Sequence, residues 1–396
     1  MNKTILVIGA GVAQVDGIKK ARSLGYRVLA SDGSANAPGL KEADESRVID
    51  VKDVKNNLAW ARERQIDGVT SYASDVSLPT VLALNEELGM SGLGRIPMEV
   101  SLDKSLQRQR FRKAGLAQPD FEIVKNFQEL EKTISRLGFP AVLKPVDNAG
   151  SRGVSLVEHA GQLATAYQSA IENSTKGSLI VEEFIEGTEL TLEGLSINGE
   201  HHILAISDKY KPEGSYRVAT QLAYPPAIPQ EQEQTARELI TAAYNAAEID
   251  NTPTHSEVIL TKSGPKIVEI GCRGGGFYVF TRVIEAVSGY DIVGNWTRIC
   301  AGDPVEKVAA ARRGVVLRFF AANPGRLVRV NGLEEAQKLE GVEAGLFVEP
   351  GDIVPELKTD GSRTGWMIAC AKDRKQAIKR ANHVSNLVKF ETEPLE

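Results

Sequence analysis

The chain has 396 residues, of which 42% are hydrophobic and 25% are charged, proportions typical of a globular protein with two or three domains and an ample core. Its 47 basic and 52 acidic residues leave a net charge of −5, so the basic surface of a nucleic-acid-binding protein is not expected. No segment approaches the roughly 18 uninterrupted apolar residues of a membrane-spanning helix, and we therefore expect no membrane partner.

The cysteines and the N-terminal residues both predict a cytoplasmic protein. Cys272, Cys300 and Cys370 are widely separated and odd in number, which indicates neither a disulfide framework nor a C-x-x-C metal site. The N-terminal residues lead directly into an apolar strand and lack the hydrophobic segment and cleavage site of a signal peptide.

The first hundred residues alternate between predicted strands and helices. Strands are expected at 5–9, Arg27–Ala30 and Gly68–Tyr72, and helices at Gln14–Leu24 and Leu78–Leu88. This β-α-β order predicts a parallel sheet covered by helices, in an N-terminal α/β domain over residues 1–100. Gly9, Gly11 and the acidic Asp32 leave a dinucleotide site open as an alternative, although an isolated G-x-G is weak evidence.

The rest of the chain is expected to form two further units. We predict one helix from Ser101 to Arg112, β-rich pieces at Ala141–Val157 and Leu179–Ile197, a polar loop at Asp208–Thr220, a helix at Gln230–Ile249, strands near Gly314–Ala321 and a last helix near Arg374–Leu387. The predicted domains are a core over 101–302, with a lid at about 119–184, and a C-terminal α/β unit over 303–396.

Two glutamates bracket a predicted hairpin. Strands at Val258–Thr261 and Lys266–Ile270, with a turn at 263–265, place Glu257 opposite Glu269 with Cβ atoms about 4.5–5.5 Å apart. At about 5 Å and an effective dielectric constant of about 20, two carboxylates repel by roughly 3 kcal/mol. They therefore need a cation or a shared proton between them, and hard oxygen ligands favour Mg²⁺ or Mn²⁺. The alternative is a pair of solvated glutamates beside Lys262 or Lys266.

Three other segments carry groups suited to a nucleotide. Lys144 ends an apolar strand just before a glycine-rich turn that contains Gly150 and Gly153, and such a turn lets backbone N–H groups approach phosphate oxygens. A Gly-Ser-x-Gly turn is equally common without a ligand. Downstream, an apolar strand runs into the acidic segment Glu182–Glu189, whose backbone suits an adenine and whose last carboxylate suits a ribose. Lys104 lies at the domain junction.

In this order the motifs resemble the ATP-grasp superfamily of carboxylate–amine ligases, over nearly the whole chain. The resemblance implies a mixed α/β and α+β ATP-grasp fold with a Rossmann-like N-terminal pre-grasp domain and a C-terminal α/β extension. It also implies roles: Lys104 and Lys144 on the phosphates of ATP; Gly150, Ser151 and Gly153 as a loop over them; Glu182 and the backbone of Glu183 and Ile185 on adenine; Glu189 on ribose; Glu257 and Glu269 on Mg²⁺; and Arg273 on an acyl phosphate and the oxyanion that follows.

One departure from the common pattern indicates a branch. Many members have Asn two residues after the second metal-binding Glu, whereas this chain has Gly271. The run from Glu269 through three glycines is similar to that of the L-amino-acid ligases, in which the residues after the arginine line the amino-acid pocket. In this chain those residues are Gly275, Gly276 and Phe277.

The resemblance implies an ADP-forming ligase with small-molecule substrates. A carboxylate would be activated as an acyl phosphate and coupled to an amine, with Lys144 and Arg273 stabilising the charge that develops. A homodimer is common in such proteins. The alternatives are a carboxyphosphate-forming or purine-pathway reaction of the same family, a nucleotide-binding module without ligase activity, and a dehydrogenase that uses Gly9 and Gly11.

Overall fold

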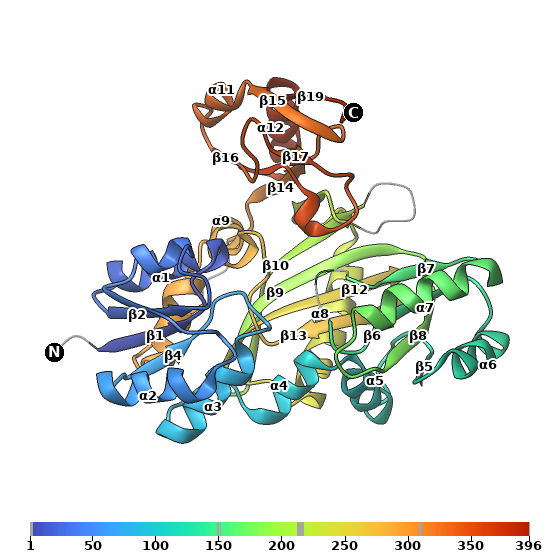
Figure 1. Cartoon of the computed structure of the whole chain (residues 1–396), viewed down its shortest axis with the longest axis horizontal. Helices are drawn as coiled ribbons and strands as arrows, with labels where there is room; N and C mark the ends of the chain where they lie inside the picture. Colours follow the sequence, from blue (N-terminus) through green and yellow to red (C-terminus); the bar gives the residue numbers. More distant parts are fainter. Residues whose placement is uncertain (1–2, 149, 151, 212–217, 309–310, 396) are drawn as a thin grey trace.

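The computed structural model describes residues 3–148, 150, 152–211, 218–308 and 311–395. Three lobes surround a long central sheet: an N-terminal lobe, a lid lobe and a C-terminal lobe (Figure 1). This arrangement confirms the predicted mixed α/β fold class. Among the described residues, no helix combines the length and apolar character needed to cross a membrane.

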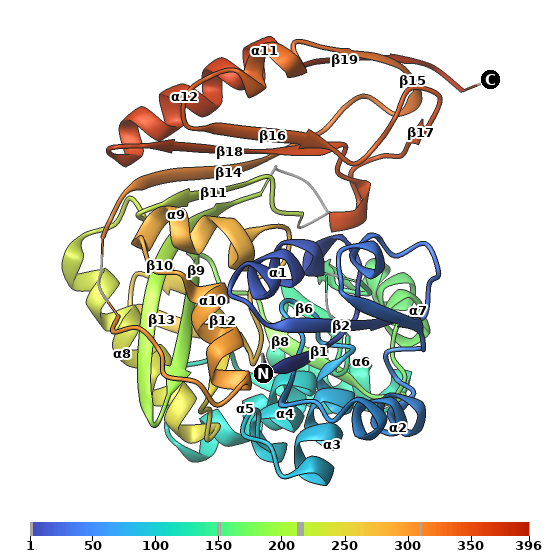
Figure 2. The same cartoon turned by 90° about the vertical axis from the view of Figure 1, so that its left-hand side faces the viewer.

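The N-terminal lobe contains the predicted parallel sheet, and its strand order is β3-β2-β1-β4. Its elements are β1 (Thr4–Ile8), α1 (Val12–Ser23), β2 (Arg27–Asp32), β3 (Glu45–Val48), α2 (Val54–Arg64), β4 (Gly68–Thr70) and α3 (Leu78–Leu88). Alternate residues of β1 face opposite sides: Val7 packs with Ile18 of α1, whereas Leu6 packs with Trp60 of α2. Helices therefore cover both faces of the sheet (Figure 2).

The predicted single helix from Ser101 to Arg112 is wrong, because Asp103 divides it into two. Helix α4 spans Arg95–Leu102 and α5 spans Lys104–Lys113. Asp103 has an extended backbone, and its carboxylate accepts hydrogen bonds from the N–H groups of Ser105 and Leu106. A side-chain cap of this kind starts a new helix, so Lys104 is the first residue of α5.

The lid lobe is an antiparallel sheet of order β5-β8-β6-β7 with two helices on one face. Its elements are β5 (Phe121–Val124), α6 (Phe127–Leu137), β6 (Ala141–Pro145), β7 (Ser155–Val157), α7 (Leu163–Glu172) and β8 (Leu179–Glu183). Leu130 and Ile134 of α6 and Ala166 of α7 pack on the sheet. Strands β6 and β8 are neighbours, so Lys144 and Glu182 lie side by side.

The central sheet is antiparallel, with the order β13-β12-β9-β10-β11-β14-β18-β16. Its first part contains β9 (Thr188–Ile197), β10 (Glu200–Tyr210), β11 (Gln221–Tyr224), β12 (Thr252–Thr261) and β13 (Gly264–Gly271), and α8 (Gln230–Ala246) packs beneath it. The predicted loop at Asp208–Thr220 is wrong at its start, because β10 continues through Tyr210. Residues 212–217 lie outside the described part of the chain.

The C-terminal lobe extends the central sheet. It contributes β14 (Gly314–Phe320), β16 (Val342–Leu346) and β18 (Gly365–Ala371), covered by α11 (Leu333–Gln337) and α12 (Arg374–Leu387). A small sheet of β17 (Ile353–Val354), β15 (Gly325–Asn331) and β19 (Lys389–Glu393) lies beside them (Figure 2). The sheet is thus continuous through β11 and β14, on either side of residue 303, where the sequence predicts a domain boundary.

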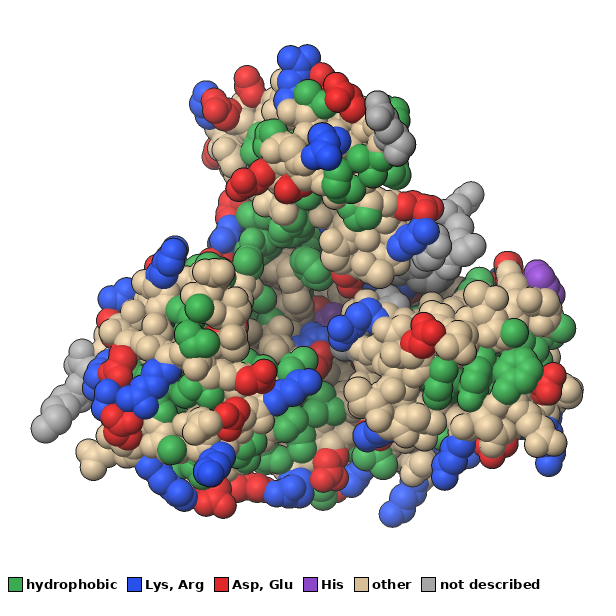
Figure 3. All heavy atoms as spheres, in the orientation of Figure 1, with side chains coloured by type: hydrophobic (Ala, Val, Ile, Leu, Met, Phe, Trp, Pro, Cys, Tyr) green, Lys and Arg blue, Asp and Glu red, His purple; other side chains and the backbone are tan. Residues whose placement is uncertain are grey.

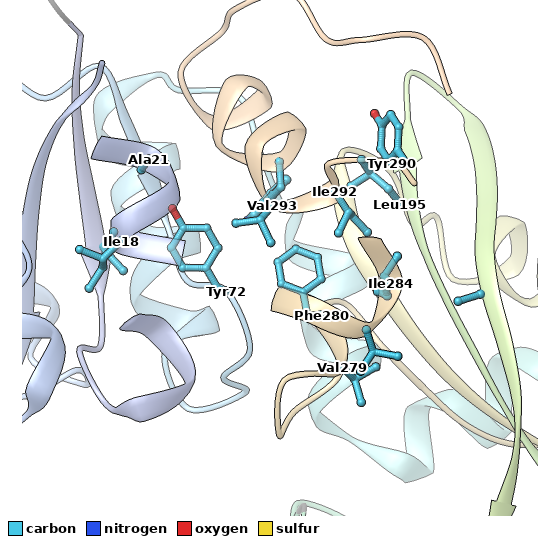
Figure 4. Packing of buried hydrophobic residues seen from close by; sticks show 14 of the residues in the cluster. Ile18, Ala21, Tyr72, Leu195, Val279, Phe280, Ile284, Tyr290, Ile292 and Val293 are labelled. Atoms are coloured by element: carbon cyan, nitrogen blue, oxygen red, sulfur yellow. The ribbon is translucent and has the colours of Figure 1, made fainter. Parts of the chain in front are cut away.

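One buried cluster joins all of the lobes except the lid. Its centre is the segment that follows β13, with a π-helical turn at Val279–Val283, then α9 (Ile284–Ser288) and α10 (Ile292–Cys300). Phe280 of this segment lies between Tyr72 of the N-terminal lobe and Leu195 of β9 (Figure 4). The chain just after Arg273 is therefore anchored in the core of the protein.

A substitution at Gly17 would test the packing of α1 against Tyr72. A Cβ atom on Gly17 of α1 would lie 2.2 Å from the ring of Tyr72. We expect Gly17→Ala to lower the free energy of unfolding by about 1–3 kcal/mol, because the clash outweighs a helix-propensity gain of at most about 1 kcal/mol. The control is Gly11→Ala, since Gly11 has a φ of −64° and nothing within 4 Å of its Cβ position. Equal denaturant midpoints for the two variants would contradict this packing.

Candidate active site

The β12–β13 hairpin pairs Glu257 with Glu269, as the sequence predicts. The predicted turn is displaced, however. The strands are joined by Lys262 and Ser263, and Pro265 lies within β13. Proline is tolerated there because β13 is an edge strand near its start, where a ladder N–H is not required.

A β-bulge at Val268 restores the predicted pairing. From the turn, Val258 pairs with Ile267, and an unbroken ladder would place Glu257 opposite Val268. The register instead shifts by one residue, so Glu257 faces Glu269. The carbonyl of the extra residue, Val268, accepts a hydrogen bond of 2.7 Å from Arg108. The bulge therefore brings the two carboxylates to one face of the sheet.

Each of these carboxylates is paired with a lysine from another element. Lys209 of β10 contacts Glu257 and also lies 2.9 Å from Glu189 of β9. Lys104 of α5 lies 3.0 Å from Glu269. Burial alone would raise the pKa of Glu257, but Lys209 and His255 outweigh burial and hold that pKa well below its usual value. Glu257 is thus placed to remain ionised.

Lys104 also reaches the glycine-rich segment of the lid. Its Nζ donates to the carbonyl oxygen of Asn148 at 2.8 Å. Gly150 and Gly153 both have positive φ, of 70° and 72°, which favours glycine. Gly150 is exposed with nothing within 4 Å of its Cβ position. Ser151, the third predicted member of this loop, lies outside the described residues.

Lys144 and Glu182 are buried next to each other in the lid. Glu182 accepts from Arg108 Nε and lies 2.7 Å from Lys144 Nζ, so its carboxylate faces these cations. Burial opposes the charged form of Glu182, but Arg108 and Lys144 outweigh it and lower the pKa to about 2. Burial lowers the pKa of Lys144, and the neighbouring Arg108 and Lys104 lower it further. Bound phosphate would relieve this excess of positive charge around Lys144.

The predicted adenine and ribose residues follow on the segment from β8 to β9. Glu183 pairs with Lys266, and its N–H already donates to Asp120 O at 2.9 Å. Ile185 is half-buried between the two strands. Glu189 is buried and lies 2.6 Å from Lys211 and 2.9 Å from Lys209. In this structure the carboxylates of Glu183 and Glu189 contact lysines that a nucleotide would have to share or displace.

Arg273 lies beside the N-terminal lobe. Its Nε donates to Asp75 at 2.9 Å, which fixes the guanidinium where the N-terminal lobe meets the central sheet. Burial opposes the charge of Arg273, but Asp75 outweighs it and raises the pKa of the guanidinium. Gly274, Gly275 and Gly276 follow directly. A Cβ on Gly274 would collide with Phe280 at 2.1 Å, whereas the Cβ position of Gly276 has nothing within 4 Å.

Several residues of the site were not predicted from the sequence. The sequence predicts a loop at Lys209 and Lys211, whereas Lys209 lies on β10 and Lys211 directly follows it. Arg108 and Asp75 carry no motif and are identified only by their contacts with Glu182 and Arg273. Glu193 is buried and accepts from His255 Nδ1 at 2.6 Å, and such a contact is invisible in the sequence.

The alternative dinucleotide site, at Gly9 and Gly11, contains a cavity, but the carboxylate of Asp32 is already hydrogen-bonded. A cavity of about 450 Å³ is lined by Gly9, Gly11, Asp32 and neighbouring residues. Asp32 already accepts hydrogen bonds of 2.8 Å from the N–H groups of Ala10 and Ser34. Its carboxylate therefore caps its own loop, which is a poor arrangement for binding a ribose.

Glu257 and Glu269 fit a magnesium ion whose other ligands are phosphate oxygens and water. Within the described ranges, His, Cys, Asp and Glu side chains do not gather in any group of three or more that could hold a metal. Glu257 and Glu269 offer hard oxygen atoms from opposite strands, and Gly271 adds no side chain. Mg²⁺ is commonly bound by one or two carboxylates, with phosphate oxygens and water as its other ligands.

Family models match two segments of the chain. Residues 137–280 match the ATP-grasp domain. They include the lid strands β6, β7 and β8, the segment Glu182–Glu189 and the paired glutamates. The middle of the chain is therefore an ATP-grasp domain. Residues 318–393 match the L-amino acid ligase C-terminal domain 2, so the C-terminal lobe is of the type found in that branch.

Known proteins similar to this chain come from more than one branch. A formate-dependent phosphoribosylglycinamide formyltransferase from Synechococcus sp. (strain CC9902) is 27% identical over 366 residues, covering 88% of each chain. An L-amino acid ligase from Bacillus licheniformis has a TM-score of 0.87 at 22% identity, covering 99% of each chain. A phosphoribosylglycinamide synthetase from Anaerococcus prevotii has a TM-score of 0.78 at 17% identity, covering 99% of this chain and 100% of that one. These two structures establish the shared fold.

The buried pair at Glu182 generates a stability prediction. We expect Glu182→Gln to lower the free energy of unfolding by about 3–5 kcal/mol, because it leaves two buried cations without their partner. The folded pKa of about 2 lies below the unfolded value of about 4.3. The stabilisation is therefore present above about pH 4.3 and is lost as the pH falls toward 2, so the difference from wild type should narrow over that range in denaturant titrations.

A surface pair on the same sheet supplies the control. Glu122 of β5 contacts Arg136 at 2.8 Å, but its side chain is 46% exposed. Glu122→Gln should therefore cost at most about 1 kcal/mol. A loss for Glu182→Gln no larger than that for Glu122→Gln would refute the buried charge network.

Proposed function

We propose that this chain is an ATP-dependent ligase that activates an amino-acid carboxylate as an acyl phosphate and couples it to an amine, forming an amide or peptide bond. The observation that carries the proposal is the pairing of Glu257 with Glu269, each beside a lysine that suits phosphate. Arg273 follows at the end of the second strand, and Gly276 just beyond it has open space at its Cβ position. The match of residues 318–393 supports an amino acid as the carboxylate.

In this proposal the nucleotide lies between the lid and the central sheet. Lys104 and Lys144 contact phosphate oxygens, with Gly150, Ser151 and Gly153 above them. The segment from Glu182 to Ile185 borders adenine, and Glu189 holds the ribose. Lys209 and Lys211, released from their carboxylates when metal and nucleotide enter, add positive charge at the same place.

Glu257 and Glu269 would hold Mg²⁺, which neutralises phosphate charge when bound. Arg273 is placed to stabilise the acyl phosphate and the oxyanion that forms when the amine attacks. Asp75 keeps the guanidinium in one orientation through its 2.9 Å contact. The chemistry then depends on positioned charge, which agrees with the absence of a recognisable nucleophile motif in the sequence.

A second candidate is a purine-pathway ligation. It is favoured by the formyltransferase relative and by the cavity of about 450 Å³ at Gly9 and Gly11, where the N-terminus of α1 offers free N–H groups to a phosphate. ADP release that requires formate with phosphoribosylglycinamide would favour this candidate over amino-acid ligation. Release that requires bicarbonate would favour a carboxyphosphate-forming reaction.

The proposal is tested by phosphate release from ATP and Mg²⁺ with amino acids supplied singly and in pairs. We expect ADP formation to require a carboxylate, and mass spectrometry to detect the coupled product. ADP release that is independent of any carboxylate would refute the proposal. Glu269→Gln should lower turnover by at least about 100-fold, whereas Glu391→Gln, which alters an exposed pair with Arg329, should not.

Gly276 and Gly274 form a matched pair for the substrate pocket. Gly276→Ala adds a methyl group in open space, so the protein should fold normally but use large amino acids about 10-fold less well. Gly274→Ala should instead destabilise the protein, because its Cβ would overlap Phe280. The measurements are kcat/KM across amino acids of increasing size and thermal unfolding. An unchanged size profile for Gly276→Ala would remove this residue from the pocket.

A homodimer and a cytoplasmic location remain predictions for this chain.

A further inference from the structure

The residues after the glycine run have an unusual backbone. Phe277 and Tyr278 are consecutive non-glycine residues with positive φ, of 50° and 67°. Side chains rarely adopt this conformation, which costs about 1–3 kcal/mol per residue unless surrounding contacts enforce it. Contacts outside the loop must therefore hold it in place.

Those contacts come mainly from the C-terminal lobe. The ring of Phe277 packs edge-on against Phe319, at 5.5 Å between centroids, and against Phe347, at 6.0 Å. The ring of Tyr278 lies 4.3 Å from that of Trp366. All three partners belong to the segment that matches the L-amino acid ligase C-terminal domain. The C-terminal lobe thus fixes the chain three residues beyond Gly274.

Arg363 contacts two of these aromatic rings. Its guanidinium lies 3.7 Å from the centroid of Phe319 and 4.6 Å from that of Phe277, within reach of cation–π attraction. It also donates to the carbonyl oxygen of Ala219 at 2.7 Å and pairs with Asp360. The residue is only 5% exposed. Arg363 therefore connects Phe277 to the segment that leads into β11.

A hollow lies between the lobes. Figure 3 shows hydrophobic side chains on the side of this hollow beneath the C-terminal lobe, with charged side chains deeper inside. Phe347 remains 38% exposed although its ring contacts that of Phe277, the residue after Gly276, so part of its apolar surface stays open. In an amino acid the side chain is attached to the carbon next to the carboxylate. A carboxylate bound at Arg273 would therefore keep the side chain near the residues that follow Arg273, of which Phe277 contacts Phe319 and Phe347.

We propose that the C-terminal lobe selects the substrate: Phe277, Phe319 and Phe347 form an apolar wall that favours an amino acid with a branched or aromatic side chain as the carboxylate that is activated. Arg363 is a positioning residue that holds Phe277 in the wall. This inference rests on the proposed ligase function. It assigns to the C-terminal lobe a part in specificity rather than only in stability.

The test uses the full chain with hydroxylamine as the amine, so that only the carboxylate varies. Each amino acid that is activated gives a hydroxamate, which is measured by colour and by mass spectrometry. For Phe347→Ala we expect KM for leucine and phenylalanine to rise about 10-fold with kcat little changed, because contact made equally in ground and transition states is lost. KM for alanine should stay within about 2-fold of wild type.

Two further variants make the test specific. Phe347→Leu keeps an apolar side chain and should recover most of the use of large substrates. Phe390→Ala removes a ring that packs against Phe320, at 5.7 Å, rather than against Phe277, and should leave the substrate profile unchanged. Thermal unfolding of each variant confirms that it is folded before its KM is compared.

The outcomes separate the inference from the function on which it rests. No hydroxamate from any amino acid with wild-type protein would refute the proposed function itself. Hydroxamate from wild type with the same profile for Phe347→Ala and Phe390→Ala would overturn the inference alone. A preference of wild type for small or charged amino acids would overturn it as well.

Discussion

The site depends on the balance of charge around two opposed carboxylates. Glu257 and Glu269 face each other only because the ladder of the hairpin shifts at Val268. Their repulsion is offset by Lys209 from β10 and Lys104 from α5, which come from elements far apart in the sequence. The positions of a strand, a helix and a hairpin are therefore coupled through four charges.

The same logic extends into the lid. Lys144 and Glu182 lie on adjacent strands, and Arg108 of α5 reaches across to the same carboxylate. Burial lowers the pKa of Lys144, whereas the pKa of Glu182 is lowered by its two cationic neighbours and its carboxylate stays ionised. The ion pair between Arg108 and Glu182 therefore joins the lid to α5. One carboxylate faces two cations there, so a negatively charged polyphosphate would balance the remaining positive charge.

The N-terminal lobe, the central sheet and the C-terminal lobe share one hydrophobic core. Phe280 and its neighbours form one cluster with the N-terminal sheet, β9 and β14, and the glycine run before Phe280 has no room for side chains at Gly274. The C-terminal lobe continues the central sheet and holds Phe277 and Tyr278 in a strained backbone. Rigid packing on both sides of the run at 274–276 places Arg273 and leaves open space only at Gly276.

The sequence alone determined the class of fold and the order of the motifs, because these follow from local periodicity. It also predicted the pairing of Glu257 with Glu269, but the register shift at Val268 that produces this pairing is seen only in the structure. The sequence could not place Asp103 as a helix cap, Pro265 inside a strand, or Lys209 on β10, since each depends on which neighbour satisfies the backbone. Arg108, Asp75 and the aromatic wall at Phe277 were decided only by the tertiary structure. Their partners lie tens to hundreds of residues away, and a contact between distant segments leaves no pattern in either one.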